Sequence, residues 1–236
     1  LHVFQRTPQF SLPARNGPLD PDKEALHKAQ YDERRKAAYD TPFGIAGFPP
    51  PTKFAAQASA QERQSAYEAK WAEGGSISFL YSYKDLLVNK EANDTASDFV
   101  RERIRQTVND PKVAEALIPY DHPIGTKRLI LDTGYYETYN RDNVTLVDVR
   151  SAPIEQITED GLRTADGQAY ELDAIVFATG FDAMTGALRE IDLRNAQGLS
   201  VAQKWQDGPR CYLGLVMSGF PNLFMITGPQ SPSVKA

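Results

Sequence analysis

The chain has 236 residues, 41% of them hydrophobic and 24% charged, a composition typical of a globular protein and not of a disordered one. Its formal net charge of −5 argues against general nucleic-acid binding. No apolar run reaches the roughly 20 residues that a membrane-spanning helix needs. The single cysteine, Cys211, cannot form an internal disulfide, so we expect a reducing, cytoplasmic setting. The three histidines are scattered without ligand spacing, and we expect no metal site.

The first half of the chain predicts one short strand followed only by helices. Residues 1–6 form the predicted strand, and a proline-rich loop follows it at Pro8. The predicted helices cover 22–39, 59–72, 91–109 and 110–118. Residues 22–118 are therefore predicted to be an all-helical insertion.

Two of these helices carry clear local signals. Ser59 stands three residues before Glu62, the spacing of a capping box at the start of a helix. Phe99, Ile104 and Val108 form one apolar stripe, which predicts the buried face of the helix over 91–109.

The second half of the chain predicts strands. They cover 128–131, 144–148, 154–158, 161–164 and 169–172, and the last three form a meander with a hairpin turn at Asp166-Gly167. Residues 174–178 and 223–227 are continuous apolar runs of the kind expected for strands buried on both faces. Strands interrupted by a helical insertion indicate an α/β fold.

Ala178-Thr179-Gly180 ends one of these apolar runs in small residues. Such an ending lets a cofactor or another backbone approach closely, so Thr179 and Gly180 are candidate cofactor-binding residues. A plain core strand that ends in a glycine turn is an equally good interpretation of these residues alone.

Arg6 and Thr7 stand at the end of the first predicted strand. An arginine there can bind the 2′-phosphate of NADP, because its planar guanidinium makes paired hydrogen bonds to phosphate oxygens. Most surface arginines that follow a strand bind nothing in particular, and the glycine-rich fingerprint of a dinucleotide site is absent from the chain.

Lys127 and Arg128 form a basic pair just before a predicted strand. A solvated strand entry is the ordinary interpretation of such a pair. In a binding site, Lys127 would add a second charge at the NADP phosphate, and Arg128, which stays protonated, would stabilise an anion.

Taken in order, seven short motifs resemble the type I Baeyer–Villiger monooxygenases, nearest to the phenylacetone and cyclohexanone monooxygenases. The motifs lie at 4–8, 125–129, 134–137, 139–141, 177–182, 212–214 and 220–224. The resemblance covers essentially the whole chain, including the helical insertion. Ordered matches at seven places are very improbable by chance.

The resemblance implies an enzyme that uses FAD, NADPH and O2 to convert ketones to esters or lactones through a flavin C4a-peroxide. It implies that Arg128 is the active-site arginine, and that Arg6, Thr7 and Lys127 bind the NADP 2′-phosphate. It also implies that a loop with three further residues borders the substrate pocket. These residues are Ser233, Val234 and Lys235, the last at a position that is more often apolar.

The resemblance further implies two Rossmann-like domains, one for FAD and one for NADP. Residues 1–21 and 119–150 would belong to the NADP domain, 22–118 to the insertion, and 151–236 to a linker meander and the FAD domain. We expect the glycine-rich loops to precede this chain and a C-terminal segment to follow it. Two alternatives are a related flavin monooxygenase that hydroxylates nitrogen or sulfur, and a non-catalytic fragment.

Overall fold

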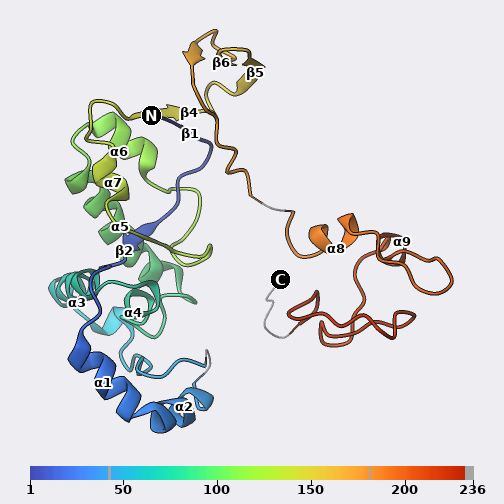
Figure 1. Ribbon diagram of the computed structural model, residues 1–236. Coiled ribbons are helices and arrows are strands. Elements are labelled where there is room, and N and C mark those ends of the chain that lie inside the picture. Colours follow the sequence, from blue (N-terminus) through green and yellow to red (C-terminus); the bar gives the residue numbers. More distant parts are fainter. Residues whose placement is uncertain (42–43, 181, 232–236) are drawn as a thin grey trace. The chain divides into compact units, whose positions relative to one another are not determined.

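The computed structural model of the chain describes residues 1–41, 44–180 and 182–231. No helix in these ranges is long and apolar enough to cross a membrane. The chain divides into two compact units, residues 1–173 and residues 174–236 (Figure 1). Every strand assigned in the described residues belongs to the first unit, which also contains the predicted helical insertion.

Two pairs of short parallel strands form the framework of the first unit. β1 (His2–Gln5) pairs with β4 (Thr145–Asp148), and β2 (Ser11–Pro13) pairs with β3 (Ile130–Asp132). Parallel strands need a long connection, and here the helices supply it. The strand predicted over 128–131 begins at Ile130, the residue whose N–H donates to the carbonyl of Phe10 at 3.3 Å.

The predicted meander is confirmed as an antiparallel sheet of three strands. They are β5 (Ile154–Thr158), β6 (Gly161–Thr164) and β7 (Ala169–Glu171). Gly167 has a φ of +85° in the turn between β6 and β7, a conformation that glycine adopts without strain. The ring of Tyr170 on β7 meets those of His2 and Phe4 edge-on, at 5.2 and 5.1 Å between centroids. The meander therefore packs against β1.

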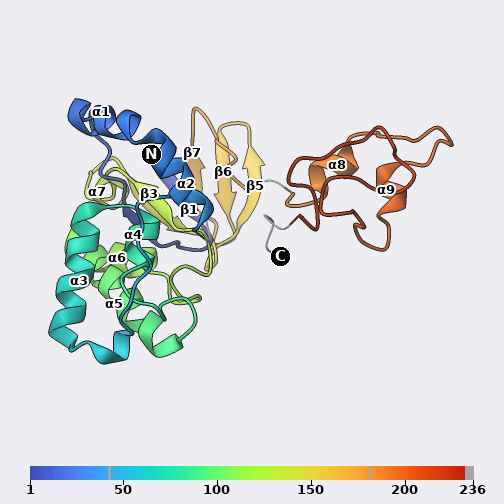
Figure 2. The ribbon, with the colours of Figure 1, turned by 90° about the horizontal axis from the view of Figure 1, so that it is seen from below.

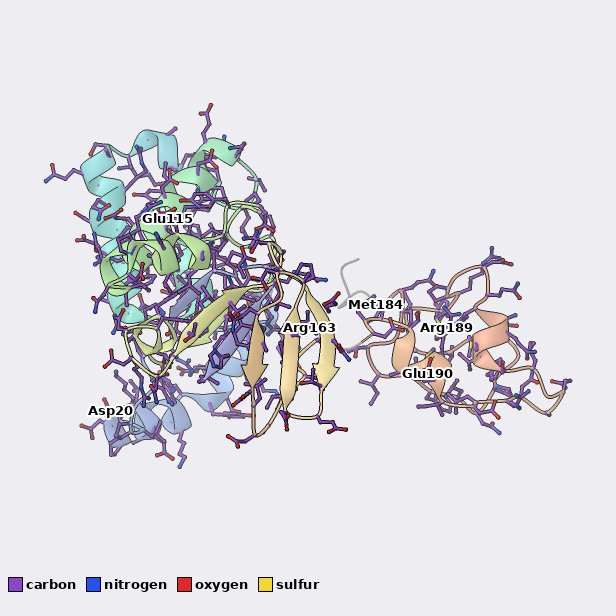
Figure 3. The ribbon with its side chains drawn as sticks, turned by 90° about the horizontal axis from the view of Figure 1, so that it is seen from above. Asp20, Glu115, Arg163, Met184, Arg189 and Glu190 are labelled. Atoms are coloured by element: carbon purple, nitrogen blue, oxygen red, sulfur yellow. The ribbon has the colours of Figure 1, made fainter. Side chains whose placement is uncertain are left out.

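The helix predicted over 22–39 is in fact two helices, so the expectation of one continuous helix is wrong. α1 (Pro21–Ala29) and α2 (Tyr31–Tyr39) meet at Gln30, whose φ of −102° and ψ of 17° lie outside helical geometry. Asp20 caps α1 by accepting from the N–H groups two and three residues further on (Figure 3). Neither helix buries a residue, so no packing surface favours a single straight axis.

The remaining helices of the insertion gather into one layer (Figure 2). They are the 3₁₀ turn η1 (Ala55–Gln57), α3 (Ala60–Glu73), α4 (Ser76–Leu80), α5 (Lys90–Thr107) and α6 (Pro111–Leu117). The predicted capping box is confirmed, because the Ser59 N–H donates to Glu62 Oε2 at 2.7 Å and the Glu62 N–H donates to Ser59 Oγ at 3.2 Å. The predicted stripe of Phe99, Ile104 and Val108 is buried.

One hydrophobic core joins the helical layer to the parallel strands. Phe10 and Leu12, in and before β2, are buried in the same cluster as Phe79 and Ile104 of the helices. Tyr136 joins this cluster from α7 (Tyr135–Thr138), the short helix between β3 and β4. The insertion therefore shares its core with the strands that it separates.

A buried amide on α5 ties the helical layer to the loop before β3. Asn93 is 5% exposed, and its Nδ2 donates to the carbonyls of Leu86 and Ile124, each at 2.8 Å. Its Oδ1 accepts from the N–H of Ile124 at 3.1 Å and from the hydroxyl of Ser97 at 3.0 Å. Both peptide groups of Ile124 are thus held by a single side chain.

Among its described residues, the second unit contains two short helices and its own small core. α8 (Gly186–Glu190) and α9 (Val201–Lys204) are accompanied by isolated β-bridges. The core consists of Val201, Trp205, Met217, Phe220 and Met225.

The strands predicted over 174–178 and 223–227 are not formed, and this expectation is wrong for the described chain. Val176 is 88% exposed and Ile226 is 91% exposed. A strand is stabilised by hydrogen bonds to a neighbouring strand, and no described residue pairs with either run as a strand. Their apolar β-forming composition is therefore not sufficient to make a strand here.

We predict that Asn93→Ala lowers the free energy of unfolding of the first unit by about 2–4 kcal/mol, because the carbonyls of Leu86 and Ile124 lose their donor inside the core. Urea unfolding of the variant measures this loss. The matched control is Asp94→Ala, which removes only an exposed pair with Lys90 and should cost less than about 0.5 kcal/mol. Equal losses in both variants would contradict the role of Asn93.

Candidate functional site

Two of the predicted binding segments lie side by side in the first unit. Arg6 and Thr7 form the bend directly after β1, and Lys127 and Arg128 precede β3, from which Leu129 separates them. Gln9 connects the two segments, because its Nε2 donates to the carbonyl of Arg128 at 3.4 Å. The parallel pairing of β2 with β3 begins two residues further along each segment, at Ser11 and Ile130, so the tertiary structure joins the segment after β1 to the segment before β3.

The cationic side chains of these segments face solvent. Within the described ranges, Arg6 and Arg128 are exposed, and neither has an ion pair or a side-chain hydrogen bond. Lys127 Nζ lies 3.8 Å from Asp121 Oδ2, both half exposed, which makes a weak pair. Thr7 adds an exposed hydroxyl. This donor set, two guanidinium groups, an ammonium group and a hydroxyl, fits a phosphate or another small anion.

The loop that carries Lys127 and Arg128 is held from the helical layer. Gly125 has a φ of +86°, and an added Cβ would lie 2.7 Å from Cδ2 of Leu87. The loop therefore needs glycine both for its backbone conformation and for its contact with the helices. Its next residue is fixed as well, since the Thr126 hydroxyl donates to the carbonyl of Pro123 at 2.7 Å.

Arginines of α5 hold the beginning of the same loop. Arg101 Nε donates to the carbonyl of Pro119 at 3.0 Å, and the guanidinium lies 5.1 Å from the ring centre of Tyr120. Glu115 on the surface of α6 (Figure 3) accepts from Arg105 at 2.6 Å and from the Tyr120 hydroxyl at 2.7 Å. The hydrogen bond with Arg105 is the main reason that the pKa of Glu115 lies below its usual value.

His122 is buried, 9% exposed, in the middle of this loop. Its Nδ1 lies 2.7 Å from Asp121 Oδ1 and its Nε2 lies 2.8 Å from Gln9 Oε1. The hydrogen bond with His122 lowers the pKa of Asp121, and the charge of Lys127 adds to this effect. His122 thus connects Asp121 to Gln9, the residue that donates to the carbonyl of Arg128.

The supporting residues were not recognised from the sequence. His122 counts there as one of three scattered histidines, and Gln9 and Arg101 have no motif. Asn93 and Ser97 offer one usable signal, since they are polar residues one turn apart on the buried face of α5. Polar side chains on an apolar face indicate a buried hydrogen-bond network.

Thr179 and Gly180 belong to the second unit, and both are exposed. Gly180 has a φ of +90°, which suits glycine, and no described atom lies within 4 Å of an added Cβ. The sequence predicts that a cofactor or another backbone approaches this motif closely. Within the second unit, no described backbone comes this close to Gly180. The loop of Ser233, Val234 and Lys235 lies outside the described residues.

Two hollows of the described surface lie away from these residues. One of about 340 Å³ runs between α3 and α5 and is lined by charged side chains such as Arg63, Glu68 and Arg103. Another of about 390 Å³ lies beyond the carboxyl ends of β2 and β3, beside Arg15 and Trp71. Neither includes a predicted site residue.

Comparison with known proteins identifies the family. The chain is 45% identical over 99% of its length to 2-oxo-Delta(3)-4,5,5-trimethylcyclopentenylacetyl-CoA monooxygenase of Pseudomonas putida. It is 42% identical over 98% of its length to a Baeyer-Villiger monooxygenase of Pseudooceanicola batsensis. The chain belongs to the Baeyer–Villiger monooxygenase family. No family model matches it.

The fold agrees with this family. The chain superposes on the crystal structure of the monooxygenase OTEMO in complex with FAD and NADP with a TM-score of 0.87 and 44% identity over 97% of its length. The helical insertion is included in the match, so it is part of the Baeyer–Villiger monooxygenase fold. The chain spans 42% of the length of both relatives and 42% of the OTEMO chain.

We predict that Gly125→Ala destabilises the first unit by about 2–4 kcal/mol. This is the sum of two free-energy costs, that of a left-handed backbone at alanine and that of an overpacked contact with Leu87. Thermal and urea unfolding measure the effect. The matched control is Gly167→Ala, which has a similar φ of +85° but no atom within 4 Å of the new Cβ, and it should cost only about 1–2 kcal/mol. If Gly125→Ala is as stable as this control, the Leu87 side chain moves aside without a cost in free energy, and the prediction is wrong.

Proposed function

We propose that the protein containing this chain is a Baeyer–Villiger monooxygenase that uses FAD, NADPH and O2 to convert ketones to esters or lactones. The observation that carries the proposal is the link that Gln9 makes between the segment of Arg6 and the segment of Lys127 and Arg128. Arg6 and Arg128 are unpaired among the described residues and Lys127 is weakly paired, and the chain matches the family along its length.

Arg6, Thr7 and Lys127 are proposed to bind the 2′-phosphate of NADP(H). The end of a parallel strand is where an α/β fold binds a nucleotide, and Arg6 and Thr7 directly follow β1. The Arg6 guanidinium can donate two hydrogen bonds to phosphate oxygens, while Lys127 adds a mobile charge. The coenzyme NADH lacks this phosphate, so the same residues would select NADPH.

Arg128 is proposed to act at the reacting atoms. Its guanidinium stays protonated at any physiological pH, so it can stabilise negative charge that develops on oxygen without exchanging a proton. Its backbone is held by Gln9 and the start of β3, which leaves the side chain free to face solvent. When bound, FAD would be the group that reacts with O2, and NADPH would supply the reducing equivalents.

The roles of the other predicted residues are proposed on the family match. Thr179 and Gly180 would lie against FAD, and Ser233, Val234 and Lys235 would border the ketone pocket. Residues 1–21 and 119–150 would form part of the NADP domain and 151–236 would include part of the FAD domain, with 22–118 inserted between them. We further propose a cytoplasmic location, which the single free Cys211 fits.

We predict that Arg6→Ala and Lys127→Ala each weaken NADP+ binding by about 10- to 100-fold, the expected loss of a charged hydrogen bond to phosphate. Isothermal titration of the full-length, FAD-loaded protein measures the dissociation constant. NAD+ serves as the control ligand, and its binding should change less than about threefold because it has no 2′-phosphate. Equal losses for both nucleotides would place these residues away from the phosphate.

We predict that Arg128→Ala in the full-length protein lowers ester or lactone formation by at least about 100-fold while FAD stays bound. Gas chromatography of the products and the flavin absorbance spectrum measure the two properties. Arg163→Ala is the matched control, because Arg163 is an exposed arginine on β6 (Figure 3) and its loss should leave the rate unchanged. An unchanged ester yield in Arg128→Ala would exclude the proposed role.

A further inference from the structure

We infer that Arg150 is a further donor to the phosphate bound at the end of β1, and that its pair with Asp148 makes this edge of the sheet compatible with a phosphate. The inference rests on the proposed binding of the NADP(H) 2′-phosphate by Arg6 and Thr7, and it adds a specificity-determining residue to that site. It is carried by the register of β1 against β4 and by the contacts at the end of β4.

β1 and β4 end at the same edge, because they are parallel and in register. Gln5, the last residue of β1, is paired with Asp148, the last residue of β4. The N–H of Val149 donates to the carbonyl of Gln5 at 3.0 Å, so the pairing continues to the point where both strands stop. Neighbouring strands lie about 4.8 Å apart, so the segment that follows β4 begins next to Arg6 and Thr7. The carboxyl ends of parallel strands are where an α/β fold binds its ligands.

Two polar side chains at this edge are occupied by the protein itself. The amide of Gln5 donates to the carbonyl of Ala116 in α6 at 2.8 Å. The hydroxyl of Ser151 donates to the carbonyl of Asp148 at 2.9 Å and closes the turn after β4. Arg150 lies in the same turn and is exposed, so it carries the positive charge on the β4 side of the edge.

The guanidinium of Arg150 is held on one side only. Its Nε donates to Asp148 Oδ1 at 3.3 Å, and the backbone N–H of Arg150 donates to the same oxygen at 2.9 Å. Its two terminal nitrogens take part in no hydrogen bond or ion pair within the part of the chain that the structure describes. These nitrogens form the other edge of a planar group whose paired N–H donors suit phosphate oxygens. Arg150 can therefore keep its contact with Asp148 and bind a phosphate at the same time.

Without its partner, Asp148 would oppose a phosphate at this edge. The hydrogen bond from the backbone N–H of Arg150 is the main reason that the pKa of Asp148 lies below its usual value, and the guanidinium lowers it further. The carboxylate is therefore charged at neutral pH, and an unpaired carboxylate would repel the 2′-phosphate of NADP. An acid near the ribose is what NAD-binding folds use to bind the free 2′-hydroxyl. By pairing with Asp148, Arg150 offsets the charge that would favour NAD, and it adds donors of its own.

Isothermal titration of the full-length, FAD-loaded protein with adenosine 2′,5′-bisphosphate and with AMP tests the inference. The two probes differ by the 2′-phosphate alone, so the ratio of their dissociation constants reports contacts with this phosphate and is insensitive to a general loosening of the turn. We expect Arg150→Ala to weaken binding of the bisphosphate by about 10- to 100-fold and binding of AMP by less than about threefold. Arg150→Lys keeps the charge but loses the paired donors, so it should weaken binding of the bisphosphate by about three- to tenfold.

Two further variants make the result decisive. Arg163→Ala is the matched control, because Nε of Arg163 also pairs with an exposed carboxylate, that of Glu155 at 3.4 Å, but on the meander, and neither probe should bind differently. Arg6→Ala separates the inference from the proposed function. If Arg6→Ala weakens binding of the bisphosphate and Arg150→Ala does not, the inference is overturned and the proposed phosphate site stands. If neither variant weakens it, the proposed phosphate site is wrong and the inference falls with it.

The part played by Asp148 is tested by combining Asp148→Asn with Arg150→Ala. Asparagine keeps an oxygen that can accept from the N–H at position 150, so the turn is retained while the negative charge is removed. We expect the double variant to bind the bisphosphate about three- to tenfold more tightly than Arg150→Ala alone, the size expected for one like charge close to the phosphate. Equal binding by the single and the double variant would overturn the inference that Arg150 offsets the charge of Asp148.

Discussion

A peptide group buried away from water needs a hydrogen-bond partner in the protein, and Ile124 satisfies this need through a side chain of α5. The side chain of Asn93 accepts from the N–H of Ile124 and donates to the carbonyl of Ile124, inside the core that the helices share with the strands. The position of the loop before β3 therefore depends on the helical layer. Gly125 follows immediately and lies so close to Leu87 that an added Cβ would meet its Cδ2 at 2.7 Å.

The basic site depends on this loop because the loop carries one of its two halves. β1 and the bend after it present Arg6 and Thr7, while the loop presents Lys127 and Arg128. Gln9 and His122 join the two halves through hydrogen bonds of 2.8 to 3.4 Å. The cations themselves take almost no part in these bonds, which leaves their donors available for an anion.

The first unit also explains how a long helical insertion can separate two strands that pair with each other. The strands on either side of it, β2 and β3, are short and pair in parallel, so they need a long connection between them. The helices supply both that connection and most of the apolar surface around Phe10 and Leu12. The insertion is thus a structural support for the site as well as a spacer.

The sequence by itself determined the elements whose signals are local. The capping box at Ser59 and Glu62 and the meander from 154 to 171 follow from short-range hydrogen bonding and strand alternation, and the family followed from ordered motifs. Only the tertiary structure decided which segments meet. The contact between Gln9 and Arg128 spans 119 residues, and no local pattern encodes it. The runs at 174–178 and 223–227 show the same limit, because a strand exists only where a neighbour pairs with it.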